Sequence, residues 1–316
     1  MKIIDAKQVN QVLDFPALIN ALDAGFRQDF GMPQRQVFSL SEDPANHDGF
    51  AVLPAWNEDV VGVKAFTYFP DNGKQALPTL FSKILLFSRQ DGTPLAMIDG
   101  TSVTYWRTAA VSALASRYLA RPESMRMLLL GTGNLALPIV KAHLSEHAIS
   151  DVVVWGRHAD KVQSLLQTLR NIYPHVNFSA TSDLGVTAAQ VDIIVSATGA
   201  AEPLLFGKDV AAGCHVDLLG NHSQDRRECD TELICRSSVY VDYRQNVLKE
   251  AGELLVPINE GRFAAADVKA DLAELCRMER SSRRDAEEIT LFKSVGTALS
   301  DLICAKLVLD SIVSLS

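Results

Sequence analysis

One short apolar run that turns directly into a helix constrains this chain more than any other feature. The run occupies Met125 to Leu130, passes through Gly131-Thr132-Gly133, and is followed by apolar residues at helical spacing. A strand can enter a helix beside an anionic ligand only where no side chain blocks the backbone, and glycine meets that requirement. The unpaired N–H groups at the start of the helix then face the anion. With Ala136 as the small third residue, the pattern predicts a dinucleotide-binding turn.

Four later apolar runs distinguish this site from an ordinary structural glycine turn. They lie at 152–155, 193–195, 216–219 and 239–241. The segments between them are long enough for helices or loops, which is typical of a mostly parallel, doubly wound α/β sheet. The sequence therefore predicts a Rossmann-type dinucleotide-binding domain over residues 121–296.

The first 120 residues follow a different pattern. Strands are expected at Val61–Phe66, Lys83–Phe87 and Leu95–Ile98, with turns at Pro70-Asp71-Asn72-Gly73 and Asp91-Gly92. Closely spaced strands and turns of this kind indicate an antiparallel, hairpin-rich region.

Two helices complete the expected architecture. One is expected over Thr108–Ala120, ending at Arg121-Pro122, and a longer one over Gly296–Ile312. We expect the last helix to return to the first region. Residues 1–120 plus 297–316 would then form an α+β domain into which the parallel sheet is inserted, with the active site in the cleft between the domains.

Composition excludes several classes of partner. The 30 basic and 38 acidic side chains give a net charge of −8, which provides no electrostatic footprint for nucleic acid or an anionic membrane surface. No apolar run approaches the roughly 20 residues of a membrane-spanning helix, so a cytoplasmic protein is expected. The five cysteines show no C-x-x-C spacing and are expected to be reduced. His143 and His147 share a helical face without further ligands, so no metal site is expected.

The choice of cofactor depends on the end of the second strand of the sheet. An acidic residue there usually binds the ribose 2′-hydroxyl of NAD, but this chain has Trp155-Gly156-Arg157-His158. A guanidinium matches a 2′-phosphate in charge and geometry, so Arg157 favours NADPH, with NADH as the alternative. An arginine that is merely solvated at a strand end is the competing interpretation.

Three motifs give the chain a family resemblance. They are Thr104-Tyr105-Trp106-Arg107-Thr108-Ala109-Ala110, the glycine turn, and Phe292-Lys293-Ser294-Val295-Gly296-Thr297-Ala298, in this order, and the resemblance spans nearly the whole sequence. In these motifs the chain resembles the ornithine cyclodeaminase and mu-crystallin family. The resemblance implies a homodimer whose substrate and dimerisation domain surrounds the dinucleotide-binding domain. It also implies a small amino or imino acid substrate, handled by a cyclodeaminase, an alanine dehydrogenase or a reductase of cyclic ketimines.

The resemblance also implies a substrate-binding group. Arg35, Lys64 and Arg107 match the three cations that hold the substrate carboxylate in family members. A convergent set of cations suits an anionic substrate, and arginine adds a planar fork that fixes orientation. Lys64 is also a candidate for proton exchange with the substrate nitrogen, because an ammonium beside other cations has a lowered pKa.

One departure from the family pattern selects among the activities. Cyclodeaminases and the alanine dehydrogenases resemble each other in an aspartate after the fifth strand, where this chain has His222, or Asn221 or Ser223 if the alignment slips. Oxidation of an amino acid needs a base for the ammonium, whereas reduction of a preformed imine needs only a proton on nitrogen. We therefore expect a ketimine reductase, with His222 either as proton donor or merely lining the cleft.

Two further carboxylates are considered. Asp217, within a predicted strand, is an alternative base, although a carboxylate there is more often a hydrogen-bonded structural group. Asp301 follows the third motif, and its role is left open. Fold geometry and the resemblance further imply cofactor contacts to the pyrophosphate, the adenosine half and the nicotinamide, from Thr108, Asn134, Leu135, Ser196, Thr198, Val295 and Gly296. For Val295, ordinary packing is the alternative.

The sequence therefore predicts an NADPH-preferring reductase of small cyclic imino acids. Pyrroline-2-carboxylate would give proline, and piperideine-2-carboxylate would give pipecolate. Three alternatives remain: an ornithine cyclodeaminase that recycles NAD, an alanine dehydrogenase-like oxidoreductase, and a mu-crystallin-like ligand binder without enzymatic activity.

Overall fold

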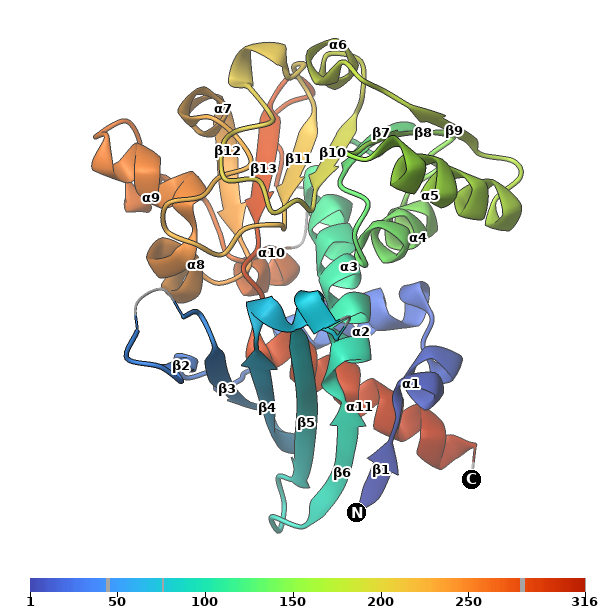
Figure 1. The fold of residues 1–316 in the computed structure, drawn as a ribbon, viewed down its shortest axis with the longest axis vertical. Coiled ribbons are helices and arrows are strands. Elements are labelled where there is room, and N and C mark those ends of the chain that lie inside the picture. The colour runs from blue at the N-terminus through green and yellow to red at the C-terminus, as the bar shows by residue number, and fades with distance from the viewer. Residues whose placement is uncertain (44–45, 76, 279–281, 316) are drawn as a thin grey trace. The chain divides into compact units, whose positions relative to one another are not determined.

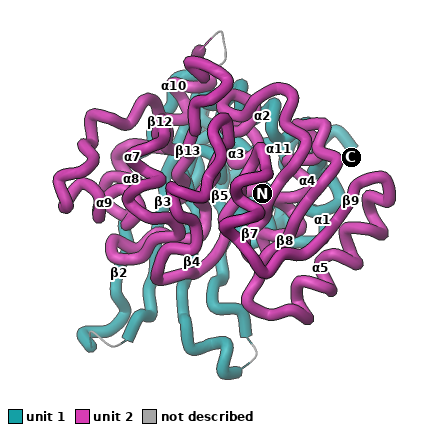
Figure 2. Tube along the Cα trace, turned by 90° about the horizontal axis from the view of Figure 1, so that it is seen from above, with its two compact units in different colours: residues 1–107, 296–316 teal, residues 108–295 magenta. Residues whose placement is uncertain are grey.

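The computed structural model describes residues 1–43, 46–75, 77–278 and 282–315 (Figure 1). The chain divides into two compact units, which Figure 2 shows in different colours. Unit 1 comprises residues 1–107 and 296–316, and unit 2 comprises residues 108–295. The chain passes into unit 2 within helix α3 (Gly100–Leu119) and leaves it after strand β13 (Ile289–Lys293). The division expected from the sequence instead placed residues 108–120 with the first domain.

Unit 1 contains a six-stranded sheet in the order β1-β6-β5-β4-β3-β2. Strand β1 pairs with β6 in parallel, and every other pair is antiparallel, so the expected hairpin-rich region is confirmed. The strands are β1 Lys2–Ile4, β2 Gln36–Ser39, β3 Gly49–Trp56, β4 Val60–Tyr68, β5 Leu80–Ser88 and β6 Pro94–Asp99.

Helix α11 (Ala298–Ser314) packs against β3, β4 and β5 and against helix α2 (Phe15–Arg27). Burial alternates along β4, so Val60, Gly62 and Lys64 are on its buried side. A Cβ atom at Gly62 would lie 2.5 Å from Leu302 Cδ1, so a larger residue there would force the Leu302 side chain to move. The same alternation places Lys64 on the face covered by α11.

Unit 1 also contains the beginning of the long helix α3 and two short helical elements. Helix α3 begins at Gly100 rather than at the expected Thr108, because Asp99 Oδ1 accepts hydrogen bonds from the backbone N–H and the hydroxyl of Ser102 and so starts the helix earlier. Arg107 therefore lies inside a helix. The other two elements are α1 Ala6–Val12 and the 3₁₀ turn η1 Pro70–Gln75.

Unit 2 contains a seven-stranded parallel sheet in the order β12-β13-β11-β10-β7-β8-β9. The first strand of the unit, β7, lies inside the sheet, and the strand order reverses between β7 and β10. This arrangement confirms the predicted doubly wound sheet. The strands are β7 Arg126–Leu130, β8 Asp151–Trp155, β9 Asn177–Ala180, β10 Ile193–Ser196, β11 His215–Leu218, β12 Ser237–Val241 and β13 Ile289–Lys293.

The continuous apolar run of β7 has a simple explanation, since Met127 to Leu130 are all fully buried, as expected for an inner strand of a parallel sheet.

The helical elements of unit 2 after α3 are α4 Ala136–Glu146, α5 Ala159–Ile172, α6 Leu184–Ala188, α7 Thr231–Arg236, α8 Arg244–Glu250, α9 Gly252–Asn259, α10 Leu272–Arg277, η2 Gly207–Asp209 and η3 Ala265–Asp267. Within the described residues, no helix has the length and apolar character that crossing a membrane requires. All five cysteines are free thiols.

Candidate functional site

A cavity of about 300 Å³ opens in unit 2 at the carboxyl ends of β7, β8 and β10. This is the switch point of the sheet, where doubly wound folds bind their ligands. The lining residues come from the segments that follow these strands: Gly131, Thr132, Gly133, Trp155, Gly156, Arg157, His158, Lys161, Ala197, Thr198, Gly199, Ala200 and Leu204.

The glycines of the turn have two different roles. Gly131 has a φ of 113°, and a Cβ atom there would lie 2.6 Å from the carbonyl oxygen of Ala197. The turn therefore needs glycine at this position for its own backbone. At Gly133 and Gly199 an added Cβ would meet no protein atom within 4 Å. Both residues line the cavity, so their missing side chains leave room for a ligand, as a dinucleotide pyrophosphate requires.

Helix α4 begins directly after this turn. Its N-cap residue is Leu135, and no side chain caps the helix there. The first N–H groups of α4 are thus without a side-chain acceptor at the cap, which suits an anionic ligand. Asn134 and Leu135 lie in the turn but do not line the cavity. Thr108, which lies in α3, does not line it either. Their predicted contacts to the pyrophosphate stay predictions.

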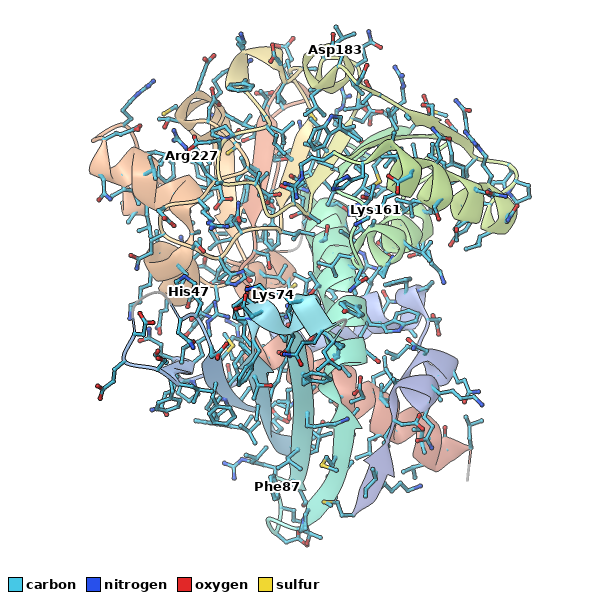
Figure 3. The ribbon with its side chains drawn as sticks, in the orientation of Figure 1. His47, Lys74, Phe87, Lys161, Asp183 and Arg227 are labelled. Atoms are coloured by element: carbon cyan, nitrogen blue, oxygen red, sulfur yellow. The ribbon has the colours of Figure 1, made fainter. Side chains whose placement is uncertain are left out.

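The cavity has basic residues in its lining. They are Arg157, His158 and Lys161, and the lining residues include no carboxylate. Lys161, labelled in Figure 3, comes from the first turn of α5. Sequence reasoning missed it, although its position four residues after Arg157 was a usable signal. Two cations in a lining without carboxylates fit a 2′-phosphate better than a bare ribose.

Glu228 connects the ends of two neighbouring strands. Its Oε1 atom accepts hydrogen bonds from Ser196 Oγ at 2.6 Å and from the backbone N–H and the hydroxyl of Thr198, each at 2.7 Å. Its Oε2 atom accepts one from Gly220 N at 2.7 Å. Thr198 lines the cavity, whereas the Ser196 hydroxyl is buried and is bonded to Glu228. Sequence reasoning missed this role of Glu228, because nothing local indicates which loops it joins.

The loop after β11 is held by a buried lysine. Lys293 Nζ donates a hydrogen bond to the Asn221 carbonyl oxygen at 2.7 Å and lies 3.1 Å from Glu253 Oε2. Both charged side chains are fully buried. His222, the next residue of the loop, is exposed. Its predicted role as a proton donor stays a prediction.

Asp217 belongs to a separate buried hydrogen-bonded chain. One of its oxygens accepts a short hydrogen bond from Ser112 Oγ, which lies 2.9 Å from His143 Nε2. Burial raises the pKa of Asp217 to about 7. Ser116 continues the chain, at 2.8 Å from His147 Nε2. Asp217 does not line the cavity, which favours the structural interpretation. Within the described part of the chain, no cluster of three or more His, Cys, Asp or Glu side chains forms a metal site.

Unit 1 holds a buried cationic cluster. Lys64, from β4, is 4% exposed, and Arg107, from α3, is 8% exposed. Lys64 Nζ lies 2.6 Å from Thr104 Oγ1 and 3.1 Å from Asp301 Oδ1. The same Asp301 oxygen accepts a hydrogen bond from Arg107 Nε at 3.0 Å. One carboxylate oxygen thus joins two of the three cations predicted to bind the substrate.

Burial and charge determine the protonation of Lys64. Its pKa is lowered to about 8, chiefly by burial. Asp301 opposes this change, whereas Arg107 and Arg35 lower the pKa further. The ammonium form therefore predominates at neutral pH, and the proton is held much less tightly than on an ordinary lysine.

Arg35 and Gly296 complete the cluster. Arg35 Nη1 donates a hydrogen bond to the Gly296 carbonyl oxygen at 3.5 Å. Gly296 has a φ of 85°, and a Cβ there would lie 2.9 Å from Arg107 Nη1. The preceding Val295 belongs to unit 2, where its N–H donates to Asp242 at 2.9 Å. Contacts of Val295 and Gly296 with a nicotinamide stay predictions.

The parallel sheet with its glycine turn defines a class, the proteins with a dinucleotide-binding fold. Within this class the family is clear. The family model described as "Ornithine cyclodeaminase/mu-crystallin family" matches residues 2–316, and the chain belongs to that family. The resemblance found in the three sequence motifs is therefore confirmed.

The chain is similar in sequence or in structure to several known enzymes. A delta(1)-pyrroline-2-carboxylate reductase of Colwellia psychrerythraea is 54% identical over 314 residues, which cover 99% of each chain. The structure of the Thermococcus litoralis delta(1)-pyrroline-2-carboxylate reductase, in complex with NADH and L-proline, has a TM-score of 0.93 and 26% identity and covers 99% of this chain and 98% of that one. An archaeal alanine dehydrogenase dimer with bound NAD has a TM-score of 0.91 and 25% identity, with coverage of 99% and 96%.

Proposed function

We propose that the protein is an NAD(P)H-dependent reductase of small cyclic imino acids. It reduces pyrroline-2-carboxylate to proline or piperideine-2-carboxylate to pipecolate. The C=N carbon gains a hydride and the ring nitrogen gains a proton, which together convert the imine to a secondary amine. When bound, NAD(P)H supplies the hydride.

The observation that carries this proposal is the cluster of buried Lys64 and Arg107 with the partly buried Arg35. With Asp301 included, its formal charge is +3 − 1 = +2, so the cluster retains an attraction for one carboxylate. The guanidinium groups orient a planar carboxylate, and this fixes the adjacent C=N carbon. Lys64, with a pKa of about 8, can give a proton to the ring nitrogen near neutral pH.

The loop after β11 favours the reductase over the cyclodeaminase. Residues 219–224 contain no carboxylate, and Glu228 is occupied by its bonds to Ser196, Thr198 and Gly220. An amino-acid oxidation therefore lacks a carboxylate base in this loop for the substrate ammonium. Reduction of an imine makes no such demand.

The preferred cofactor is NADPH, because Arg157 and Lys161 line the cavity and no acidic side chain is among its lining residues. NADH is the alternative, and the Thermococcus reductase was solved with NADH. We further propose a homodimer in the cytoplasm. The archaeal alanine dehydrogenase, which shares the fold, is a dimer.

The decisive experiment follows NADPH absorbance with purified protein and each of the two imines, beside an assay of ammonia release from ornithine. Consumption of NADPH without ammonia from ornithine would support the reductase. Ammonia and proline from ornithine without net cofactor consumption would replace it by the cyclodeaminase. A protein inactive in both assays that still binds NADPH would be a ligand binder.

A further inference from the structure

We propose that Asp301 is a positioning residue for imine reduction, because its Oδ1 atom holds Lys64 and Arg107 together and keeps Lys64 in its ammonium form. This inference rests on the proposed function. It assigns a role to a carboxylate that does not itself bind an anionic substrate.

The contacts of Asp301 are unusual for a helix residue. Its Oδ1 atom lies 3.1 Å from Lys64 Nζ and 3.0 Å from Arg107 Nε, and these partners come from a strand and a different helix. Without the carboxylate, two cations would share one buried environment with Arg35 nearby, and like charges there repel strongly. Asp301 therefore allows the two cations to remain side by side.

Stability alone does not account for a carboxylate at this position. Asp301 is 1% exposed on α11, and its Oδ2 atom has no hydrogen-bond partner among the described residues. A buried ion with an unpaired oxygen is a weak source of stability, and a complete buried ion cluster can often be replaced by apolar side chains without loss to the fold. We therefore look for the role of Asp301 in its effect on the two cations that it holds, Lys64 and Arg107.

The effect on Lys64 follows from all the charged groups that face it. Arg35 and Arg107 lower its pKa, as does burial, and Asp301 is the group that raises it. The nearby Cys304 thiol on α11 stays neutral, because burial raises its own pKa. Removal of the Asp301 charge therefore lowers the pKa of Lys64 below about 8, toward or through neutrality.

The test compares Asp301→Asn with Asp301→Glu, and Asp310→Asn serves as a matched control. Asp310 lies on the same helix but is exposed and pairs with Lys306. With pyrroline-2-carboxylate, Asp301→Asn should lower kcat/KM at pH 8 about fivefold and shift its alkaline limb to lower pH by about one unit. Asp301→Glu should keep the alkaline limb near its original pH, and Asp310→Asn should change neither quantity.

An unshifted alkaline limb in a folded Asp301→Asn protein would overturn the proposal, because a merely structural carboxylate would lower activity at every pH alike. If Asp301→Asn fails to fold, the double variant Lys64→Met/Asp301→Asn, in which both charges are removed, is compared with Lys64→Met alone. Equal kcat in Lys64→Met and Lys64→Met/Asp301→Asn supports action through Lys64. A further large loss of kcat in the double variant contradicts it if KM for the imine is unchanged, because a loss through Arg107, which holds the substrate carboxylate, would raise KM.

A readout without substrate separates this inference from the proposed function. The lysine side chains are labelled with ¹³C at Cε, and the Lys64 signal is assigned by its absence from Lys64→Gln. Its titration should move to lower pH in Asp301→Asn and stay unchanged in Asp310→Asn. If the wild type reduces neither imine, the proposed function fails, but this titration still tests the role of Asp301. An unchanged Lys64 titration in Asp301→Asn overturns it.

Discussion

Gly131 and Ala197 approach each other so closely that a Cβ atom on Gly131 would lie 2.6 Å from the Ala197 carbonyl oxygen. Gly131→Ala should therefore lower the free energy of unfolding by about 1 to 3 kcal/mol, because it combines this clash with a positive φ. Gly133→Ala is the matched variant, since its Cβ would meet only open space. It should unfold like the wild type yet bind NADPH more weakly. Calorimetry and cofactor fluorescence measure the two effects, and equal stability of both variants would contradict this assignment.

Lys64→Met tests the proton-donating role of the buried lysine. The variant should lower kcat by about 10² to 10⁴ and leave NADPH affinity within about twofold, because Lys64 acts on the substrate. Lys83→Met is a suitable control, since Lys83 also pairs with an aspartate, Asp99, but is exposed. Steady-state kinetics and cofactor titration give both quantities. An unchanged kcat in Lys64→Met would remove Lys64 from the mechanism.

Arg157→Ala and Lys161→Ala test the choice of nucleotide. Each should raise the KM for NADPH by about tenfold to a hundredfold and leave that for NADH nearly unchanged, because only NADPH offers a charged partner. Lys208→Ala is the control, since Lys208 is exposed outside this cavity. Equal efficiency of the wild type with NADH and NADPH would show that Arg157 does not recognise the phosphate.

His215 should make the protein sensitive to acid. Burial lowers its pKa from 6.5 to about 3, so the unfolded chain binds a proton in this interval that the folded state does not. The stability from a neutral His215 is present above pH 6.5 and decreases by about 1.4 kcal/mol for each pH unit below it. Denaturant unfolding of His215→Gln should depend less on pH between 6.5 and 4.5 than that of the exposed control His175→Gln. Parallel pH dependences would refute the assignment.

The sequence alone determined the features that depend on neighbouring residues. The apolar run from Met125 to Leu130 and the glycines after it predicted the β7 turn, because strand burial and backbone freedom are local properties. The same periodicity located most of the parallel strands. It missed β9, in which Phe178 is the single large apolar side chain, and β13, which follows a polar segment. A strand with one large apolar residue gives no apolar run to recognise.

Only the tertiary structure decided which side chains meet. Lys64 and Asp301 are separated by 237 positions, and Arg107 and Asp301 by 194. No local pattern encodes such pairs, because they arise where α11 packs onto β4 and beside α3. The sequence could identify Lys64 and Arg107 as candidates by family resemblance, but the role of Asp301 stayed open. The charges that control Lys64 depend on distances, and distances between remote residues exist only in the folded chain.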